Sequence, residues 1–238
     1  MQRLLLLPAT LSLSLLGVVL SQTISPADVA AQHRLLLEND RVRVFAVNIP
    51  VGQQTFIRHQ HNFLTVALED SQMVMWSEGA SANLVFHINR GDTRFFLGGA
   101  AFGMRNDGQK EYRNVTVEFL DPRVTNYGFN YNLAGGPRWD YGSSALAPPA
   151  DPRAGFVHPL PLQAAVVRDV QLLSGEQLPT LLQPARELLI AVSDLNLTAG
   201  TNASLRRSAG EIAWLEGRTS PLINQGTVPV RFVAVEVK

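Results

Sequence analysis

The chain has 238 residues, a formal net charge of +0 and no cysteine. Balanced charge without a basic stripe gives it no electrostatic attraction for nucleic acid or for an acidic membrane surface, so neither is expected as a partner. Without cysteine there are no disulfides and no thiolate chemistry, and stability has to come from packing.

The first residues have the pattern of a secretory signal. Arg3 supplies a positive start, Leu4 to Leu20 form a nearly continuous apolar run, and Val19-Leu20-Ser21 resembles a cleavage site. We therefore expect a signal peptide over residues 1–21 and a secreted or periplasmic mature chain with no membrane attachment. A retained anchor stays open as the alternative, because the run is close to the shortest spanning length of about 17 residues.

The pattern of the rest of the chain predicts β-structure. Fourteen prolines and eighteen glycines divide it into short apolar runs, and a short helix is expected only around residues 27–37. A succession of short β-branched or aromatic runs predicts a sandwich or barrel. The predicted strands are 42–49, 63–68, 73–76, 84–88, 115–120, 164–173, 187–192, 211–215 and 228–237.

The order of these strands occurs twice. Asn106-Asp107-Gly108 and the strand that follows match Asn224-Gln225-Gly226 and its strand without a gap, as far as Glu118 and Glu236. Upstream, Gly52 corresponds to Gly175. An internal repeat of this length predicts two copies of one domain.

The region between the copies is rich in Gly, Pro and aromatic residues, which is the composition of a linker. We therefore predict one domain over 22–122, a linker over 123–155 and a second domain over 156–238. The aromatic residues of the linker are expected to pack on the barrels, because each could bury a large apolar surface.

In its glycine, histidine and asparagine spacing the chain resembles the cupin superfamily. Gly52 precedes His59-Gln60-His61 with one residue more than the family's first motif has, and Gly91, Gly99 and Asn106 follow the spacing of its second motif. The later copy keeps the pattern in Gly175, and in Gly210 to Asn224 with one residue deleted. The resemblance implies an all-β fold of two tandem cupin-type barrels, that is, two double-stranded β-helices or jelly rolls.

In cupins that bind metal, the resemblance implies three histidines and one glutamate inside the barrel. Alternate residues of a strand share a face, so His59 and His61 are expected to point inward together, with Arg58 and Gln60 pointing outward. Iron, manganese or zinc accepts imidazole ligands, so the first barrel is a candidate site for one of these divalent ions.

The rest of that ligand set is missing. Residues 62–65, which cover the positions of the glutamate, contain no carboxylate, and Phe102 stands where the third histidine belongs. In the second copy the histidine positions fall at Leu182, Pro184 and Ser220, so that only Glu187 survives. We expect Phe102, Leu182, Glu187 and Ser220 to line the barrel interiors.

Two functions follow as hypotheses. The first is an exported bicupin without a complete metal site, which binds a small organic ligand or whose barrels are filled. The alternative is a metal-dependent dioxygenase or isomerase that uses His59, His61 and an unconventional third ligand such as His87 or Glu69. Whether the protein is an enzyme, which ligand it takes and whether it forms a homo-oligomer stay open at this point.

Overall fold

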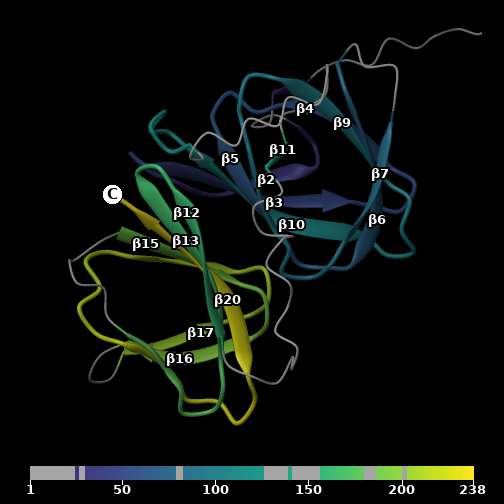
Figure 1. The fold of residues 1–238 in the computed structure, drawn as a ribbon. Coiled ribbons are helices and arrows are strands. Elements are labelled where there is room, and N and C mark those ends of the chain that lie inside the picture. Colours follow the sequence, from purple (N-terminus) through teal and green to yellow (C-terminus); the bar gives the residue numbers. More distant parts are fainter. Residues whose placement is uncertain are drawn as a thin grey trace, which may run out of the picture.

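The computed structural model describes residues 25–26, 30–78, 83–125, 139–140, 156–179, 186–199 and 203–238. Throughout these ranges the regular structure is β-strand (Figure 1), which confirms the expected all-β class. The signal-like segment and most of the linker lie outside the described residues.

The strands form two groups in chain order. The first group is β1 Ser25–Pro26, β2 His33–Glu38, β3 Val42–Ile49, β4 Gln54–Arg58, β5 Phe63–Ala67, β6 Ser71–Ser77, β7 Leu84–Ile88, β8 Thr93–Phe96, β9 Ala101–Asn106, β10 Tyr112–Phe119 and β11 Trp139–Asp140. The second is β12 Phe156–Leu162, β13 Ala165–Leu172, β14 Gln177–Leu178, β15 Arg186–Ala191, β16 Leu195–Ala199, β17 Ala203–Arg207, β18 Ile212–Leu215, β19 Leu222–Asn224 and β20 Val230–Val237.

Each group folds into a barrel of two facing sheets. The first barrel has a sheet in the order β1-β4-β9-β6-β7 and another in the order β11-β8-β5-β10-β3-β2. The second has β12-β13-β20-β15-β18 and β14-β19-β16-β17. All strand pairs are antiparallel except the two-residue pairing of β1 with β4.

Alternate side chains of β10 point to opposite sides of its sheet. Val115, Val117 and Phe119 point toward the second barrel, where they join an apolar cluster. Glu118 points into the first barrel, where it contacts His59. A strand with one face on each side of a sheet has this period of two.

The two copies repeat one another in hydrogen bonding as well as in sequence. Asn106 Nδ2 donates to the carbonyl oxygens of Ile49 and Lys110. In the second barrel, Asn224 Nδ2 donates to those of Leu172 and Val228. Each asparagine also accepts from the backbone N–H two residues later.

The motif glycines adopt matching backbone angles in the two copies. Gly52 and Gly175 have φ of 72° and 77°, and Gly91 and Gly210 both have 88°. Because this left-handed region strains residues with a Cβ, the glycines of the repeat are required by the turns.

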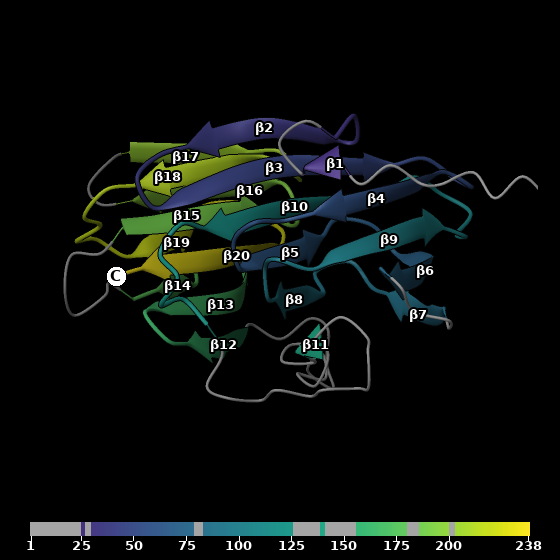
Figure 2. The ribbon, with the colours of Figure 1, turned by 90° about the horizontal axis from the view of Figure 1, so that it is seen from above.

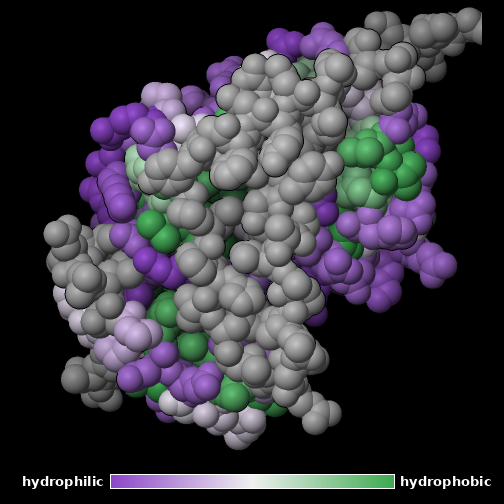
Figure 3. Space-filling model, viewed as in Figure 1, coloured by the Kyte–Doolittle hydropathy of each residue, from purple (hydrophilic) through white to green (hydrophobic). Residues whose placement is uncertain are grey.

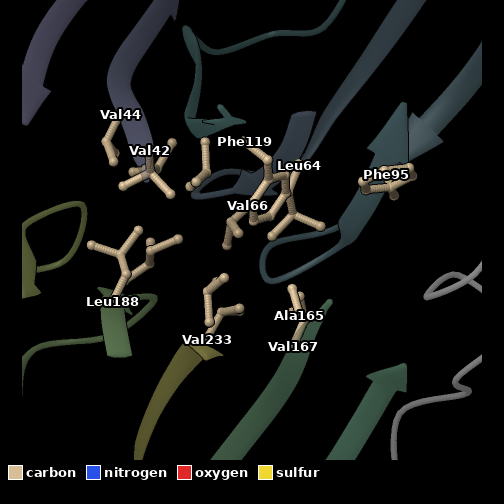
Figure 4. Close-up of a cluster of buried hydrophobic side chains, with 14 of the residues drawn as sticks. Val42, Val44, Leu64, Val66, Phe95, Phe119, Ala165, Val167, Leu188 and Val233 are labelled. Carbon is tan, nitrogen blue, oxygen red and sulfur yellow. The ribbon is translucent and has the colours of Figure 1, made fainter. Parts of the chain in front are cut away.

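The two barrels pack through equivalent faces. One continuous cluster joins residues of β3, β5, β8 and β10 to residues of β13, β15 and β20, and Figure 4 shows side chains of the two barrels facing each other across it. The registers make the contributors equivalent pairs. These pairs are Val42 with Ala165, Val44 with Val167, Leu64 with Leu188, Val66 with Ile190, Leu68 with Val192, Val115 with Val233, Val117 with Val235, and Phe119 with Val237.

Polar contacts also join the barrels at the margin of this face. Arg90 donates from Nε to the carbonyl oxygen of Val192 at 3.0 Å, and Arg231 Nη1 donates to that of Arg90 at 3.1 Å. Arg186 forms an ion pair with Asp40 at 3.0 Å. The barrels lie side by side in Figure 1, and they partly overlap when the molecule is seen from above in Figure 2.

One predicted element is wrong. Where a helix is expected over 27–37, the described part contains β2, the edge strand that pairs with β3. Backbone pairing with β3 therefore overrides the local helical pattern of this segment. Of the linker, residues 139–140 form β11, which pairs with β8 at Phe95 and Phe96.

Candidate functional site

His59 lies inside the first barrel, just after β4 ends. Its side chain is 2% exposed, and its Nδ1 lies 2.8 Å from Oε1 of Glu118 on β10. Arg43 on β3 reaches the other carboxylate oxygen of Glu118 at 3.7 Å. A carboxylate at Nδ1 fixes the orientation and tautomer of the imidazole ring, so Nε2 is the nitrogen left for other partners.

A second histidine lies beside it. His33 begins β2 and is buried, with its ring centroid 5.5 Å from that of His59. Its other ring neighbour is Phe45 at 5.9 Å, edge to face. His158 also lies in a strand, β12.

Aromatic rings occupy the rest of this region. Phe63 stacks on His59 with centroids 4.0 Å apart, and Phe102 lies 5.9 Å from Phe63 at an interplanar angle of 6°. Phe96 completes the stack 4.9 Å from Phe63. Phe102 is buried in this stack, and Phe63 fills the barrel at one of the positions where the sequence resemblance seeks a glutamate.

His61 is not presented as His59 is. Thr55, Ile57 and His59 are buried, while Arg58 and Gln60 are exposed, as the strand period predicts. The strand ends at Arg58, however, and His61 is half-buried in the turn that follows, where its backbone lies against Gly98. Strand alternation therefore does not extend to His61.

The proposed third ligands are not brought to His59. His87 is exposed on the edge strand β7, and its carbonyl oxygen accepts from Arg94. Glu69 pairs with Arg113 beyond the end of β5. Neither side chain is shown near His59.

A row of polar groups follows β10 through the first barrel. Tyr112, Asn114, Thr116 and Glu118 alternate inward and are all buried. Thr116 Oγ1 donates to Asn114 Oδ1 at 2.8 Å. Burial raises the pKa of Tyr112 to about 12, so its hydroxyl remains protonated in the physiological range.

The equivalent row on β20 is mostly apolar. Register places Val230, Phe232, Ala234 and Glu236 at the corresponding positions, and the first three belong to the apolar core of the second barrel. The two interiors therefore differ in chemistry although the backbones correspond.

The second barrel keeps one buried carboxylate, and it is paired. Glu187 is fully buried, and Arg218 Nε donates to its Oε2 at 2.7 Å. Arg218 Nη1 also donates to the carbonyl oxygen of Ser220 at 2.8 Å. Of the residues predicted to line this interior, Glu187 is buried and paired, Ser220 contributes its backbone, and Leu182 lies outside the described residues.

These side chains do not fit the metal set that the fold implies. Glu118 contacts Nδ1 of His59, His61 lies in a turn, and the rings of Phe63 and Phe102 lie beside His59. Metals of the iron, manganese and zinc type need several imidazole or anionic ligands around one point. Within the described ranges, no group of three or more His, Cys, Asp or Glu side chains could hold a metal ion.

The described surface offers shallower features. A cleft of about 300 Å³ between β2 and the β17–β18 turn is lined by Arg34, Leu36, Arg207, Gly210, Glu211 and Ile212. Leu84 and Val85 on β7 are 40% and 57% exposed, and Figure 3 shows a hydrophobic group on the side of the molecule where β6 and β7 lie. No helix in the described ranges is long and apolar enough to span a membrane.

Solved structures with the same arrangement of strands are cupins. A cupin 2 conserved barrel domain protein from Leptotrichia buccalis matches over 87% of this chain and 88% of its own, with 10% identity and a TM-score of 0.56. A salicylate 1,2-dioxygenase variant from Pseudoaminobacter salicylatoxidans, in complex with gentisate, matches over 88% and 75%, with 13% identity and a TM-score of 0.56.

The oxalate decarboxylase of Bacillus subtilis, a protein with Mn(II) centres, matches over 87% of this chain and 76% of its own, with 12% identity and a TM-score of 0.54. No protein-family model matches the chain, and no curated protein matches it. Likeness at this identity establishes the fold. The chain is a protein of the cupin fold, with two barrels in tandem, as the internal repeat predicts.

Proposed function

We propose that the protein is an exported bicupin that binds a small organic ligand in its first barrel, without a resident metal ion, while the second barrel serves as its structural partner. The observation that carries this proposal is the contrast between the two interiors. Buried polar groups cost stability unless they are partnered, so a row of four in one barrel, where three of the equivalent positions in the other are apolar, favours a role in recognition.

The aromatic stack supports the absence of a metal. Phe63 and Phe102 take the space beside His59 that further ligands would need, and Glu118 already occupies one of its nitrogens. Polar groups beside aromatic faces are the lining of sites for small organic molecules.

The second candidate is the metal-dependent dioxygenase or isomerase. It is favoured by the chemistry named for two similar structures, one a dioxygenase and one with Mn(II) centres. For this chain it would require His59 to bind metal beside Glu118 and without a third imidazole.

Elemental analysis of full-length protein purified without an affinity tag separates the two functions. We expect iron, manganese and zinc well below one ion per chain, unchanged in His59→Gln. Stoichiometric metal that is lost in His59→Gln would establish the second candidate instead.

Native mass spectrometry of the same preparation tests ligand binding. We expect a bound organic molecule that is lost when Asn114→Phe copies the lining of the second barrel at the equivalent position. The reverse exchange, Phe232→Asn, should leave the bound molecule in place. The mass of the secreted chain tests export, with Gln22 as the expected first residue.

A further inference from the structure

The cleft between β2 and the β17–β18 turn has walls from both barrels. Arg34 and Leu36 come from β2 of the first barrel, and the second barrel supplies Arg207, Gly210, Glu211 and Ile212. Its volume of about 300 Å³ is at the lower end of the range of about 300–1,000 Å³ that is typical of ligand sites. The cleft can therefore hold a small molecule, and it exists only where the two barrels meet.

The equivalent place on the other side of the joint is filled by two arginines. Arg90 donates from Nε to the carbonyl oxygen of Val192 at 3.0 Å, and Arg231 Nη1 donates to that of Arg90 at 3.1 Å. The guanidinium of Arg231 lies directly against Gly91, which is the equivalent of Gly210. Side chains therefore close the joint on that side.

At the cleft, the residue equivalent to Arg90 is Ala209. The backbone N–H of Arg90 donates to Oδ1 of Asp70, and that of Ala209 donates in the same way to Oδ1 of Asp194. The two turns thus correspond residue by residue. Alanine leaves open the space that the arginine side chain fills on the other side.

Two further differences shape the cleft. Arg113, the equivalent of Arg231, pairs with Glu69 of its own barrel instead of reaching across the joint. Leu36 is the extra residue at the register shift of β2, whereas β12, the strand equivalent to β2, pairs with β13 without a shift. A β-bulge re-aims a side chain, and here Leu36 forms part of the apolar wall.

The charges of the lining favour an anion. Nε and Nη1 of Arg207 donate to two backbone carbonyl oxygens, at 2.9 and 2.6 Å, which holds its guanidinium in place. Within the described ranges, Nη2 of Arg207 and the guanidinium of Arg34 have no hydrogen-bond acceptor or ion-pair partner. Glu211 accepts from the backbone N–H of Ser208 at 2.8 Å. Its charge offsets one arginine, so one positive charge is in excess.

We propose that this cleft binds a small organic monocarboxylate, whose carboxylate accepts hydrogen bonds from the two arginines and whose apolar part lies against Leu36 and Ile212. Charge-assisted hydrogen bonds are the stronger kind, and an arginine that is already held in place loses little conformational entropy on binding. The single excess charge favours a monocarboxylate over inorganic phosphate. The cleft is separate from the interior of the first barrel, so the proposal does not rest on the proposed function.

NMR titration of the ¹⁵N-labelled full chain tests the proposal with benzoate, and with benzamide as the neutral molecule of the same shape. We expect benzoate to shift the backbone amide signal of Gly210 but not that of Gly91, its equivalent on the closed side. The dissociation constant should be about millimolar for a ligand of this size. For benzamide it should be at least about tenfold higher, because the charge-assisted hydrogen bonds are lost.

Three variants locate the site. Ala209→Arg should close the cleft as Arg90 closes its counterpart, and so abolish the shift at Gly210. Arg207→Met should weaken benzoate binding about 10- to 100-fold, because it removes a charged donor. Arg105→Met removes the same charge from an exposed arginine outside the cleft, and it should leave the affinity unchanged.

Repeating the titration in Asn114→Phe separates the cleft from the first barrel, whose proposed ligand site that substitution blocks. Benzoate binding should persist there. Binding that is lost in Asn114→Phe but kept in Ala209→Arg would place benzoate in the first barrel and overturn the proposal. So would an unshifted Gly210 signal, equal affinity for benzamide, or tighter binding of inorganic phosphate. A first barrel found without any bound molecule would overturn the proposed function alone.

Discussion

Glu118 and Glu187 are both buried carboxylates, but each is partnered by a different group. Glu118 contacts an imidazole and lies 3.7 Å from an arginine, whereas Glu187 lies in a two-nitrogen contact with Arg218, with Nε at 2.7 Å and Nη2 at 3.5 Å. Burying a charge is costly unless a partner and hydrogen bonds compensate it. Removing one member of either pair should therefore destabilise the protein more than removing both.

Removing one partner in the second barrel should therefore be costly. Arg218→Met removes both close contacts of Glu187 and leaves it only Arg168, whose Nη1 lies 3.9 Å from Oε1, so we expect the free energy of unfolding to fall by about 3–5 kcal/mol. Adding Glu187→Met should recover most of the loss. Urea denaturation measures both variants.

Arg186→Met is the matched control, since its ion pairs with Asp40 and Glu216 lie at the surface. It should change the unfolding free energy little, because exposed ion pairs contribute weakly. If Arg218→Met and Arg186→Met had the same effect, the buried pair would not have the importance assigned to it.

At this scale the sequence predicted part of the site. It identified His59, Phe102 and Glu187 by their place in the repeat, and the inward direction of His59 by alternation. It did not identify Glu118, His33 or Arg218 as partners. Alternation tells which face a residue occupies, but the pairing of His59 with a residue on β10 arises only when the sheets close.

Among the elements, the two asparagine turns have the most similar contacts. Asn106 and Asn224 are buried, and each satisfies two carbonyl oxygens and one backbone N–H in its turn. Asn106 accepts one further hydrogen bond, from Ser71 Oγ. Each side chain thus fixes the conformation of its turn at the end of the barrel.

Asn106→Ala and Asn224→Ala should each destabilise the protein by about 1–3 kcal/mol for every buried group left without a partner. The loss at Asn106 should be the larger, because Ser71 also loses its acceptor. Thermal and urea unfolding of the two variants measure this order. Gln225→Ala, which removes only an exposed hydrogen bond to Thr198, is the control and should have almost no effect; a larger loss at Asn224 than at Asn106 would contradict the expected order.

Most elements were predictable because their signals are local. β3 and β7 occupy the predicted residues, and β13 and β20 differ from prediction only at their ends. The helix expected over 27–37 fails because the apolar pattern of so short a segment fits either structure. The decision comes from pairing with the edge of β3, the next strand in the chain, which the pattern within 27–37 does not reveal.

At the scale of the whole molecule, each barrel has an apolar face that is buried only because the other barrel packs against it. The packing should therefore make unfolding a single cooperative transition. Fluorescence of single-tryptophan variants that keep Trp76 in the first barrel or Trp214 in the second should report the same urea midpoint. Two separate midpoints would show that the barrels unfold independently.

The same face should be sensitive to equivalent substitutions. Leu64→Ala and Leu188→Ala remove buried side chains at equivalent positions, and each should cost about 2–5 kcal/mol in urea denaturation. Leu84→Ala, at a residue 40% exposed, is the control and should cost far less. A large loss of unfolding free energy at only one of the two buried leucines would show that the equivalent positions do not contribute equally to stability.

The equivalence of the paired residues gives the joint between the barrels an approximate two-fold symmetry, the form of contact that two identical subunits make when they associate. In an association of identical subunits, every substitution appears in both partners at once. Here one chain carries both halves, and its covalent connection keeps them together. A substitution therefore changes one half only, which lets Phe232 replace the polar residue that Asn114 still supplies in the other half. Joining the halves lets the two interiors differ, with buried polar groups on β10 and mostly apolar residues at the equivalent positions of β20.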